Sequence, residues 1–405
     1  MNRIAIFSLA LLATLVPISI AFAERELSYP IAEQHSWGFI DKNGVFKIRP
    51  QFDSGNVFTN GFASVWADGN HHRYTIIDTA GKPITSELFH QTGKMFCGLA
   101  PITRDPKSDR DFSTATYISK NGTIWTSSFW QCGQFENGFS IAKRYFQKFA
   151  GTPNDDESFI IDSKGKTIKK LDGTLWELEF SEGLVPIRIG QQMGYADTKG
   201  DVVIKPRFRI ARQFHEGLAA VNIQPTGTLR DGCGFINKRG EQVIPAIYSS
   251  AQDFHEGLAR VESRGDDTGG FIDQHGKLVI RLNSVISSGD FSEGLAAVHV
   301  SASETGFMDH TGKILFKVES NEVGEFHNGL CHAASFKSED RLVGFIDKSG
   351  KWAIEPQFYK AMNFSEGLAA VCVFDKKRLQ EQRATWKKEA DEFRSRTWWQ
   401  FWGSY

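Results

Sequence analysis

Two series of glycines run through this chain in a fixed phase, and they constrain its fold more than any other feature. One series marks a turn in each of nine copies, at Gly44, Gly81, Gly122, Gly165, Gly200, Gly240, Gly276, Gly312 and Gly350. The second follows 16 to 18 residues later in each copy, at Gly61, Gly98, Gly138, Gly183, Gly217, Gly257, Gly294, Gly329 and Gly367. A repeat of this length is typical of arrays in which each unit completes its core against its neighbours. The sequence therefore predicts nine copies of one short unit.

The front half of each copy has the pattern of a β-hairpin. Apolar pairs such as Phe345-Ile346 precede the turn glycine, and apolar residues such as Ile354 follow it. An aspartate stands three residues before the glycine in most copies, at Asp41, Asp78, Asp162, Asp197, Asp273, Asp309 and Asp347. Its side chain can bond the backbone of a type I turn, which a left-handed glycine then closes. Two strands joined by a tight turn are therefore predicted.

The back half of each copy predicts a third strand and a core layer. Prolines such as Pro206 and Pro356 should stop the second strand, because proline cannot donate to a ladder. A closing Gly-Leu-Ala-Ala-Val, as at Gly217 to Val221, should be the third strand. Three residues before the second glycine stands a large apolar residue, at Phe58, Met95, Phe135, Phe180, Phe214, Phe254, Phe291, Phe326 and Phe364. A large apolar residue at one phase predicts a core layer between stacked units.

These units predict an all-β fold of tandem β-meander repeats, each a hairpin plus a third strand. Such an array can run as an open solenoid or close into a β-propeller. Propeller blades usually have four strands, whereas only three can be counted here, so the strand count favours the open, solenoid-like array.

The first copy reads Trp37-Gly38-Phe39-Ile40-Asp41 and continues through Gly44 to Asn60-Gly61-Phe62-Ala63. This pattern closely resembles the bacterial WG repeat family, and the resemblance covers roughly residues 36–373. The tryptophan of the motif occurs only in the first copy; the same phase elsewhere holds Tyr74, Ala115, Ser158, Met193, Cys233, Gly269, Thr305 and Val343. The resemblance implies an interaction module with no common chemistry.

The N-terminus has the pattern of a secretory signal peptide. An apolar run from Ile4 to Ile20 follows Arg3 and ends at Ala21-Phe22-Ala23, a small-residue cleavage site. We expect residues 1–23 to be removed, residues 24–35 to lead into the repeats, and the chain to be periplasmic or secreted. The alternative is an uncleaved anchor, because this mostly apolar run of seventeen residues reaches the lower end of the range that spans a bilayer.

Residues 374–405 differ in composition from the repeats. Leu379, Trp386, Ala390 and Phe393 lie at helical spacing among alternating charges, which predicts a C-terminal amphipathic helix. Such a helix would cap the last unit. The alternative is a weak membrane-interface contact by the aromatic tail, which contains Trp398, Trp399, Phe401, Trp402 and Tyr405.

Charge and motifs exclude several function classes. The formal net charge is −1, and loss of Arg3 with the signal makes it −2, so nucleic acid is not an expected partner. No nucleophile motif or phosphate-binding loop is present, and the sequence predicts no catalytic, cofactor-binding or metal-binding residue and no cofactor. Glutamates next to the second glycine, such as Glu216, are expected to be solvated turn acids.

Two sets of side chains are candidates for binding a metal ion or for pairing in a disulfide. His215, His255 and His327 share one phase, and adjacent copies should align His215 with His255. Other copies hold Ser, Thr or Phe there, so a metal site is not expected. Among the five cysteines, Cys97 and Cys132 lie about one copy apart and form the preferred disulfide pair.

The sequence thus predicts a non-catalytic repeat scaffold of the cell envelope that binds a protein partner through the array surface and its edge loops. Insertions within residues 104–111, 151–157, 224–231 and 264–268 should project from one edge, where repeat arrays often bind, although tolerated loop variation gives the same pattern. The alternative is a carbohydrate or cell-wall binding module using Trp66, Trp125 and Trp130, unless these pack in the core. A hydrolase with an unrecognised site is the third possibility, and the Arg264-Gly265-Asp266 tripeptide is expected to be an exposed turn.

Overall fold

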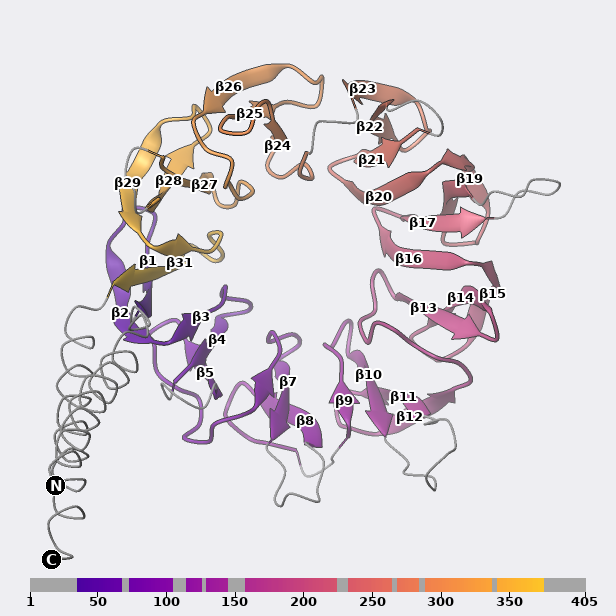
Figure 1. The fold of residues 1–405 in the computed structure, drawn as a ribbon. Coiled ribbons are helices and arrows are strands. Elements are labelled where there is room, and N and C mark those ends of the chain that lie inside the picture. Colours follow the sequence, from indigo (N-terminus) through magenta and orange to yellow (C-terminus); the bar gives the residue numbers. More distant parts are fainter. Residues whose placement is uncertain are drawn as a thin grey trace, which may run out of the picture. The chain divides into compact units, whose positions relative to one another are not determined.

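The computed structural model describes residues 35–67, 73–104, 114–125, 129–144, 157–223, 232–263, 268–283, 288–336 and 341–374. Nearly all of them belong to one compact unit, Ser36–Val373, which is described here by itself. Its elements are antiparallel β-strands in nine small sheets (Figure 1). The described residues contain no helix able to cross a membrane. The predicted signal peptide and C-terminal helix lie outside the described residues and stay predictions.

Sheet 6 shows the complete arrangement of one sheet. Its strands follow one another in chain order: β16 (Ile210–His215), β17 (Leu218–Ile223), β18 (Gly232–Asn237) and β19 (Gln242–Tyr248). The first two strands end one sequence copy, and the last two begin the next. The sheet is therefore out of phase with the repeat by half a copy.

The other sheets built from consecutive strands use the same order. Sheet 2 contains β3 (Ser54–Gly55), β4 (Phe62–Trp66) and β5 (Tyr74–Asp78), and sheet 3 contains β6 (Gln91–Thr92), β7 (Leu99–Arg104) and β8 (Thr114–Ser119). Sheet 4 contains β9 (Gln131–Cys132), β10 (Phe139–Arg144), β11 (Glu157–Asp162) and β12 (Thr167–Leu171). Sheet 5 contains β13 (Leu184–Ile189), β14 (Gln192–Asp197) and β15 (Val202–Phe208), and sheet 7 contains β20 (Ser250–His255), β21 (Leu258–Glu262), β22 (Thr268–Asp273) and β23 (Leu278–Asn283). Sheet 8 contains β24 (Ala296–His299), β25 (Thr305–Met308) and β26 (Ile314–Val318), and sheet 9 contains β27 (Leu330–Ala334), β28 (Val343–Asp347) and β29 (Trp352–Phe358).

Sheet 1 joins the two ends of the repeat region. Its order is β2-β1-β31-β30, so β1 (His35–Ile40) and β2 (Phe46–Phe52) pair with β31 (Ala369–Phe374) and β30 (Lys360–Ala361). The nine sheets consequently form a closed ring, a β-propeller arrangement, with sheet 9 followed by sheet 1 (Figure 1). The predicted all-β fold of tandem meanders is confirmed. The array closes into the ring that was the alternative prediction, and it does not form the favoured open array.

The sequence favours the open array because it does not reveal one strand of each sheet. The segment before the second glycine, which carries the core phenylalanine, pairs with the third strand, as β16 does with β17. In several copies this strand is only two residues long, as in β3, β6, β9 and β30. Such a short strand has no alternating pattern to reveal it. With it, a sheet has the four strands of a propeller blade.

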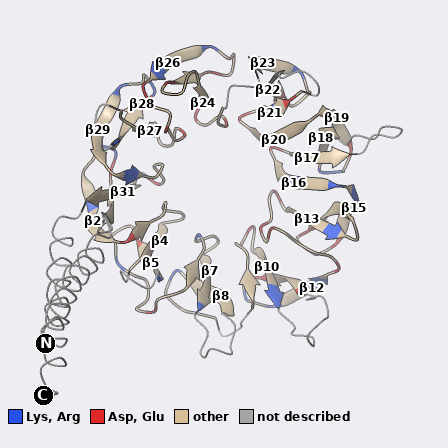
Figure 2. Cartoon of the chain, in the orientation of Figure 1, with Lys and Arg blue, Asp and Glu red and all other residues tan. Residues whose placement is uncertain are grey.

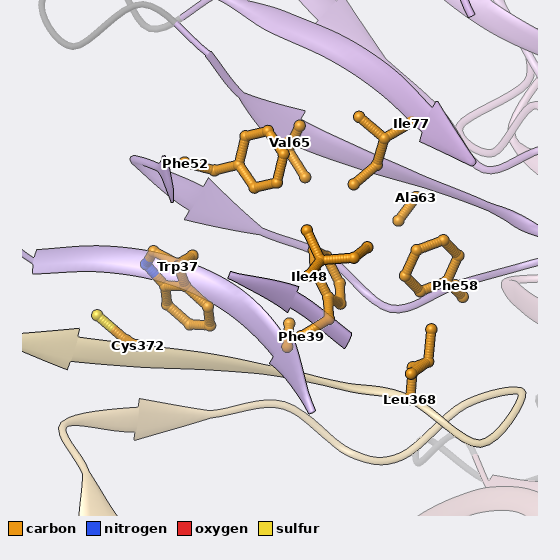
Figure 3. Close-up of a cluster of buried hydrophobic side chains, with 11 residues drawn as sticks. Trp37, Phe39, Ile48, Phe52, Phe58, Ala63, Val65, Ile77, Leu368 and Cys372 are labelled. Atoms are coloured by element: carbon orange, nitrogen blue, oxygen red, sulfur yellow. The ribbon is translucent and has the colours of Figure 1, made fainter. Parts of the chain in front are cut away.

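Nine hydrophobic clusters hold the ring together, and each lies between two consecutive sheets. Figure 3 shows the cluster in which Trp37, Phe39 and Ile48 of sheet 1 pack against Phe58 and Ile77 of sheet 2. The predicted core layer is confirmed, because Met95 and all eight phenylalanines of that phase are buried. Seven of them contact a Phe or Tyr of the preceding sheet with ring centroids 4.8–5.2 Å apart.

The turn after each hairpin strand has the predicted chemistry. Asp41 Oδ1 accepts hydrogen bonds from the backbone N–H groups of Asn43 (2.9 Å) and Val45 (3.0 Å), and Gly44 has a φ of +77°. The first carbon of a side chain at Gly44 would contact Ile354 of sheet 9 at 3.3 Å. The turn glycine therefore also allows each turn to pack against the preceding sheet.

The glycine of the WG motif has a separate role that involves the prolines. Pro50, Pro206, Pro245 and Pro356 do not end their strands but lie inside the outermost strands β2, β15, β19 and β29. The pairing register shifts opposite them, so the edge strand bulges toward its partner. A side-chain carbon at Gly38 would lie 2.7 Å from both Ile48 O and Pro50 N. Only glycine fits beneath this bulge, and the proline is tolerated because its strand is at the sheet edge.

Candidate functional site

A rim of nine two-residue turns connects the first and second strands of the sheets, toward the middle of the ring in Figure 1. Both central residues of each turn have positive φ, as in the type I′ hairpin. The second is always glycine, and the first is Asn60, Cys97, Asn137, Glu182, Glu216, Glu256, Glu293, Asn328 or Glu366. Since five of the nine are glutamate and not the usual Asn or Gly, a further interaction must favour the glutamates.

That interaction is a relay of hydrogen bonds from one turn to the next. Glu216 accepts a bond from the Gly257 N–H (2.8 Å), and Glu366 accepts bonds from the Asn60 (2.6 Å) and Gly61 (2.8 Å) N–H groups. Glu182, Glu256 and Glu293 bond Gly217, Gly294 and Gly329 in the same way. The expectation that these glutamates are simply solvated is therefore wrong. The relay was not visible in the sequence because its partner is a backbone group one copy away.

Ionisable side chains gather beside this rim on sheets 6 to 9. The imidazoles of His215 and His255 lie 5.6 Å apart by ring centroids, so the predicted alignment of these two residues is confirmed. His255 Nε2 lies 3.5 Å from Asp290, and Arg212 donates two bonds of 2.9 Å to Asp253. We call the set the acid–histidine arc: Arg212, His215, Asp253, His255, Asp290, Glu325 and His327.

The arc does not bring all three histidines together. His327 lies apart from the other pair and contacts Glu325 at 3.3 Å. Among the described residues, no three His, Cys, Asp or Glu side chains are grouped so that they could hold a metal ion.

A cavity of about 500 Å³ opens between sheets 8 and 9, and Asp290 and Glu325 of the arc line it. Gly289 and Gly324 precede these two acids, and only Gly289 leaves open space beside the cavity. A side-chain carbon at Gly289 would meet no atom within 4 Å, whereas at Gly324 the space is filled by the ring of His332. We call this space the 8–9 cavity.

Asp290 and Glu325 give the 8–9 cavity an acidic lining. Burial raises the pKa of Asp290, and the neighbouring carboxylates of Glu325 and Asp253 raise it further against His255 and Arg212. Burial lowers the pKa of His332, although Asn363, whose Oδ1 lies 2.8 Å from His332 Nδ1, opposes that effect. A histidine with a lowered pKa is neutral at pH 7, so it does not compensate the two carboxylates.

A smaller cavity of about 240 Å³ occupies the equivalent place between sheets 2 and 3. Lys94 lines it where Glu325 lines the larger one. Thr92 and Ser288 share one repeat phase but lie on opposite walls of their cavities, and each has a buried hydroxyl oxygen with no hydrogen-bond partner among the described residues. The ring thus has two related cavities of opposite lining charge.

The tryptophans considered for carbohydrate binding do not form one surface. Trp125 packs with Tyr117 and Phe135 in the core between sheets 3 and 4, and Trp66 lies half-buried against Tyr74 with centroids 5.4 Å apart. Trp130 is also half-buried. Among the tryptophans that the structure describes, the exposed one is Trp176, at 63%, with the guanidinium of Arg188 4.4 Å from its ring centroid. No repeat position distinguishes it in the sequence.

The cysteines are all free thiols, so the preferred pair of Cys97 and Cys132 is not found. Cys97 occupies a left-handed position in the turn rim, whereas Cys132 lies in β9. Burial raises the pKa of Cys132 and of Cys331 to about 12. Thiols with such pKa values are poor nucleophiles at neutral pH.

The predicted edge loops fall mostly outside the described residues, as does the Arg264-Gly265-Asp266 tripeptide. Their flanking strands are described. Each insertion joins the strands that hold the second and third positions of the four-stranded pattern. These pairs are β7 and β8, β10 and β11, β17 and β18, and β21 and β22. The four insertions therefore leave from the same connection of their sheets.

Comparison with known proteins gives one family and a set of distant structures. No curated protein sequence matches the chain. Among solved structures, BamB from Moraxella catarrhalis has 11% identity and a TM-score of 0.41 over 78% of this chain and 95% of its own. Hsv2 from Kluyveromyces lactis has 9% identity and a TM-score of 0.36 over 73% and 98%. The WD40 β-propeller domain of Doa1 has 13% identity and a TM-score of 0.30 over 72% and 94%. Likenesses this distant transfer no function.

The sequence family is better defined. The model of the WG containing repeat matches residues 37–69, 193–224, 234–265, 306–331 and 344–377. These segments include the WG-type glycines Gly38, Gly194, Gly234, Gly306 and Gly344. The chain belongs to the WG containing repeat family.

Proposed function

We propose that this protein is a non-catalytic scaffold of the cell envelope that binds a protein partner through the inner rim of its ring and its edge loops. The observation that carries the proposal is the acid–histidine arc, which lies beside a rim whose turns are hydrogen-bonded to one another. Side chains on such a rim are positioned before a partner arrives. Pre-organisation of this kind lowers the entropic cost of binding.

Charge supports a protein rather than a nucleic acid as the partner. Figure 2 shows Lys and Arg interspersed with Asp and Glu over the sheets, with no continuous basic band. The formal net charge of −1 agrees with that distribution. Nucleic-acid binding relies on a basic surface, so it is disfavoured.

The envelope location rests on the N-terminal sequence. The apolar run followed by Ala21-Phe22-Ala23 is the pattern of a cleaved signal peptide. Expression of the full chain in a bacterium with fractionation and N-terminal sequencing tests it. We expect periplasmic or secreted protein that begins at Glu24; cytoplasmic protein that begins at Met1 contradicts this part of the proposal.

Partner binding is tested with the tagged full chain as bait in an envelope extract, followed by rebinding of each captured protein in purified form. Two variants probe the proposed surfaces: the triple substitution of His215, His255 and His327 by Ala, and replacement of residues 224–231 by a Gly-Ser linker. The control variant replaces the exposed turn residues Asn43, Arg239 and His275 by Ala. We expect a purified partner to bind the control and to lose affinity for at least one test variant. Capture of no protein that rebinds, or equal binding to all variants, contradicts the proposal.

A further inference from the structure

We propose that the outer edge of sheet 7, formed by β23, binds an extended acidic segment of the protein partner, which adds to the sheet as a further strand. Binding by strand addition uses main-chain hydrogen bonds for affinity and side chains for selectivity. The inference rests on the proposed function only for the source of the segment. It concerns a different surface from the inner rim, so the two can be tested apart.

Most outer strands of the ring are protected against such pairing. β2, β15, β19 and β29 contain the prolines, and the pairing register of each shifts twice, so the edge is bulged and lacks one N–H donor. In β12, the exposed Lys169 and Lys170 form ion pairs with Asp201 and Glu157. Proline, bulges and charged side chains are the devices by which natural sheets prevent the addition of another strand.

β23 contains no proline and pairs regularly. Its residues 280–283 pair one by one with residues 268–271 of β22, and its single register shift lies at the end next to the turn. β23 is the last strand of its sheet, and among the described residues no strand pairs with its outer side. In an edge strand, alternate N–H and C=O groups point away from the sheet. Those of β23 are therefore available to an added strand.

β26 is the nearest equivalent of β23, and the two differ in charge. β26 also lacks proline and pairs regularly with β25. Its mid-strand Lys317 is neutralised by Glu304, whose carboxylate lies 2.9 Å away. Arg281 holds the same position in β23, where it is exposed and forms no ion pair with a described residue. The edge of sheet 7 therefore has a cation that is free to pair.

The side chains along this edge select the charge of the added strand. Lys277 and Arg281 are both exposed, and the apolar Leu278 (39% exposed) and Val279 (41%) lie between them. Opposite charges on adjacent strands stabilise a sheet, and like charges destabilise it. A second copy of this chain that paired antiparallel about Val279 would set Lys277 opposite Arg281. An acidic segment that also contains apolar residues is therefore the favoured occupant.

Binding is measured on the full chain by fluorescence anisotropy with three labelled eight-residue peptides. The first alternates glutamate and valine, the second alternates lysine and valine, and the third is the first with proline at its two central positions. We expect the first to bind at least tenfold more tightly than either of the others, because the second has the wrong charge and the third lacks N–H donors. Hydrogen exchange of the complex should show added protection within residues 278–283 and none within residues 202–208.

Charge reversal tests the assigned edge. Lys277→Glu with Arg281→Glu should weaken the acidic peptide at least tenfold and should make the lysine peptide the tighter of the two. The milder Arg281→Gln should weaken the acidic peptide at least threefold. The control variant, Lys205→Glu with Lys351→Glu, makes the same change in net charge at the equivalent positions of sheets 5 and 9, and it should leave binding unchanged. Thermal unfolding identifies a variant that has failed to fold, and Arg281→Gln then decides.

No binding of the acidic peptide, equal binding of the three peptides, protection elsewhere in the chain, or unchanged binding by the charge variants overturns the proposal. A wild-type dimer that the charge-reversal variant dissociates, measured by analytical ultracentrifugation, would place a second copy on the edge and also overturn it. The partner assay separates the two proposals. If a partner binds the wild type and the charge-reversal variant equally while no peptide binds, only the edge proposal fails. If the acidic peptide binds as expected but no partner is found, the proposed function fails and the edge remains a peptide-binding surface.

Discussion

Sheet 1 and sheet 6 have the same four strand positions but different covalent connections. In sheet 6 the strands are consecutive, whereas sheet 1 takes β1 and β2 from one end of the repeat region and β30 and β31 from the other. The pairing is nevertheless the same: Phe39 pairs with Ile48 as Phe235 pairs with Ile244. Each sheet takes its first two strands from one sequence copy and its last two from the next copy. A tandem array therefore has two strands at each end that lack the other half of their sheet. These two pairs complete one ordinary sheet, so closure requires no special interface.

We use the word seam for sheet 1, where the two ends of the repeat region pair. The largest effect is expected from truncating one core phenylalanine at the seam and the equivalent phenylalanine in sheet 6. Phe39 and Phe235 are both fully buried, and each packs on the phenylalanine of the next sheet. Phe39→Ala and Phe235→Ala should each lower the free energy of unfolding by about 3–5 kcal/mol. Chemical denaturation measures both. A seam variant that costs far less than its counterpart would show that sheet 1 is frayed in solution.

A smaller loss is expected from the glycine beneath the bulge. In Gly38→Val and Gly234→Val, the new side chain would meet the carbonyl of the facing edge strand at 2.7 Å and 2.6 Å. Each should cost about 1–3 kcal/mol, because the bulged strand must move. Gly289→Val, where there is open space, serves as the control in the same thermal unfolding series. Equal tolerance at all three positions would contradict this role for the glycine.

The turn relay should contribute less again. Glu366 bonds two turn amides across the seam, and Glu216 bonds one amide between sheets 6 and 7. Replacing either by Gln should cost about 0.5–1 kcal/mol, since the bonds are at the surface. Denaturation of Glu366→Gln, Glu216→Gln and the double variant measures this. If the relay acts locally, the two costs add; a strongly non-additive result would mean that the rim acts as one unit.

The smallest effect is a pH dependence. Burial raises the pKa of Glu293, but Lys348 and the turn amide of Gly329 outweigh it, so the pKa is below its ordinary value of 4.5. A lowered pKa in the folded state gives stability that is present above the unfolded pKa and is lost as the pH falls through the folded pKa. Between pH 7 and pH 3, Glu293→Gln should lose about 0.3–0.5 kcal/mol less stability than the wild type. Glu319→Gln, an exposed acid, should follow the wild type, and the same curve for both variants would contradict the assignment.

Much of the fold was predictable because it depends on residues at fixed phase. The turn aspartates and glycines set the hairpins, and the buried phenylalanines set the layers between sheets. The fourth strand was missed because two-residue strands such as β3 and β30 have no periodicity of their own. Ring closure was missed with it, because the pairing of β1 with β31 is a contact between residues more than 300 positions apart.

The candidate site was less predictable. The alignment of His215 with His255 followed from phase alone. The 8–9 cavity did not, because it depends on the absence of side chains at Gly289 and Gly324 and on which neighbour fills each gap. The ring of His332 fills the space beside Gly324, whereas the space beside Gly289 stays open. The packing of the two sheets decides this difference, so it could not be predicted from the sequence.

The central claim, that sheets 9 and 1 are neighbours like any other two, can be measured directly with spin labels. Asn43 and Ser349 are exposed residues just before the turn glycines of sheets 1 and 9, and Arg239 and His275 hold the same positions in sheets 6 and 7. Each pair is labelled in a chain whose partly exposed cysteines, Cys97, Cys132 and Cys233, have been replaced, and pulsed electron resonance gives the distance. The ring predicts the same distance distribution for both pairs. A much longer distance across sheets 9 and 1 than across sheets 6 and 7 would show that the array is open.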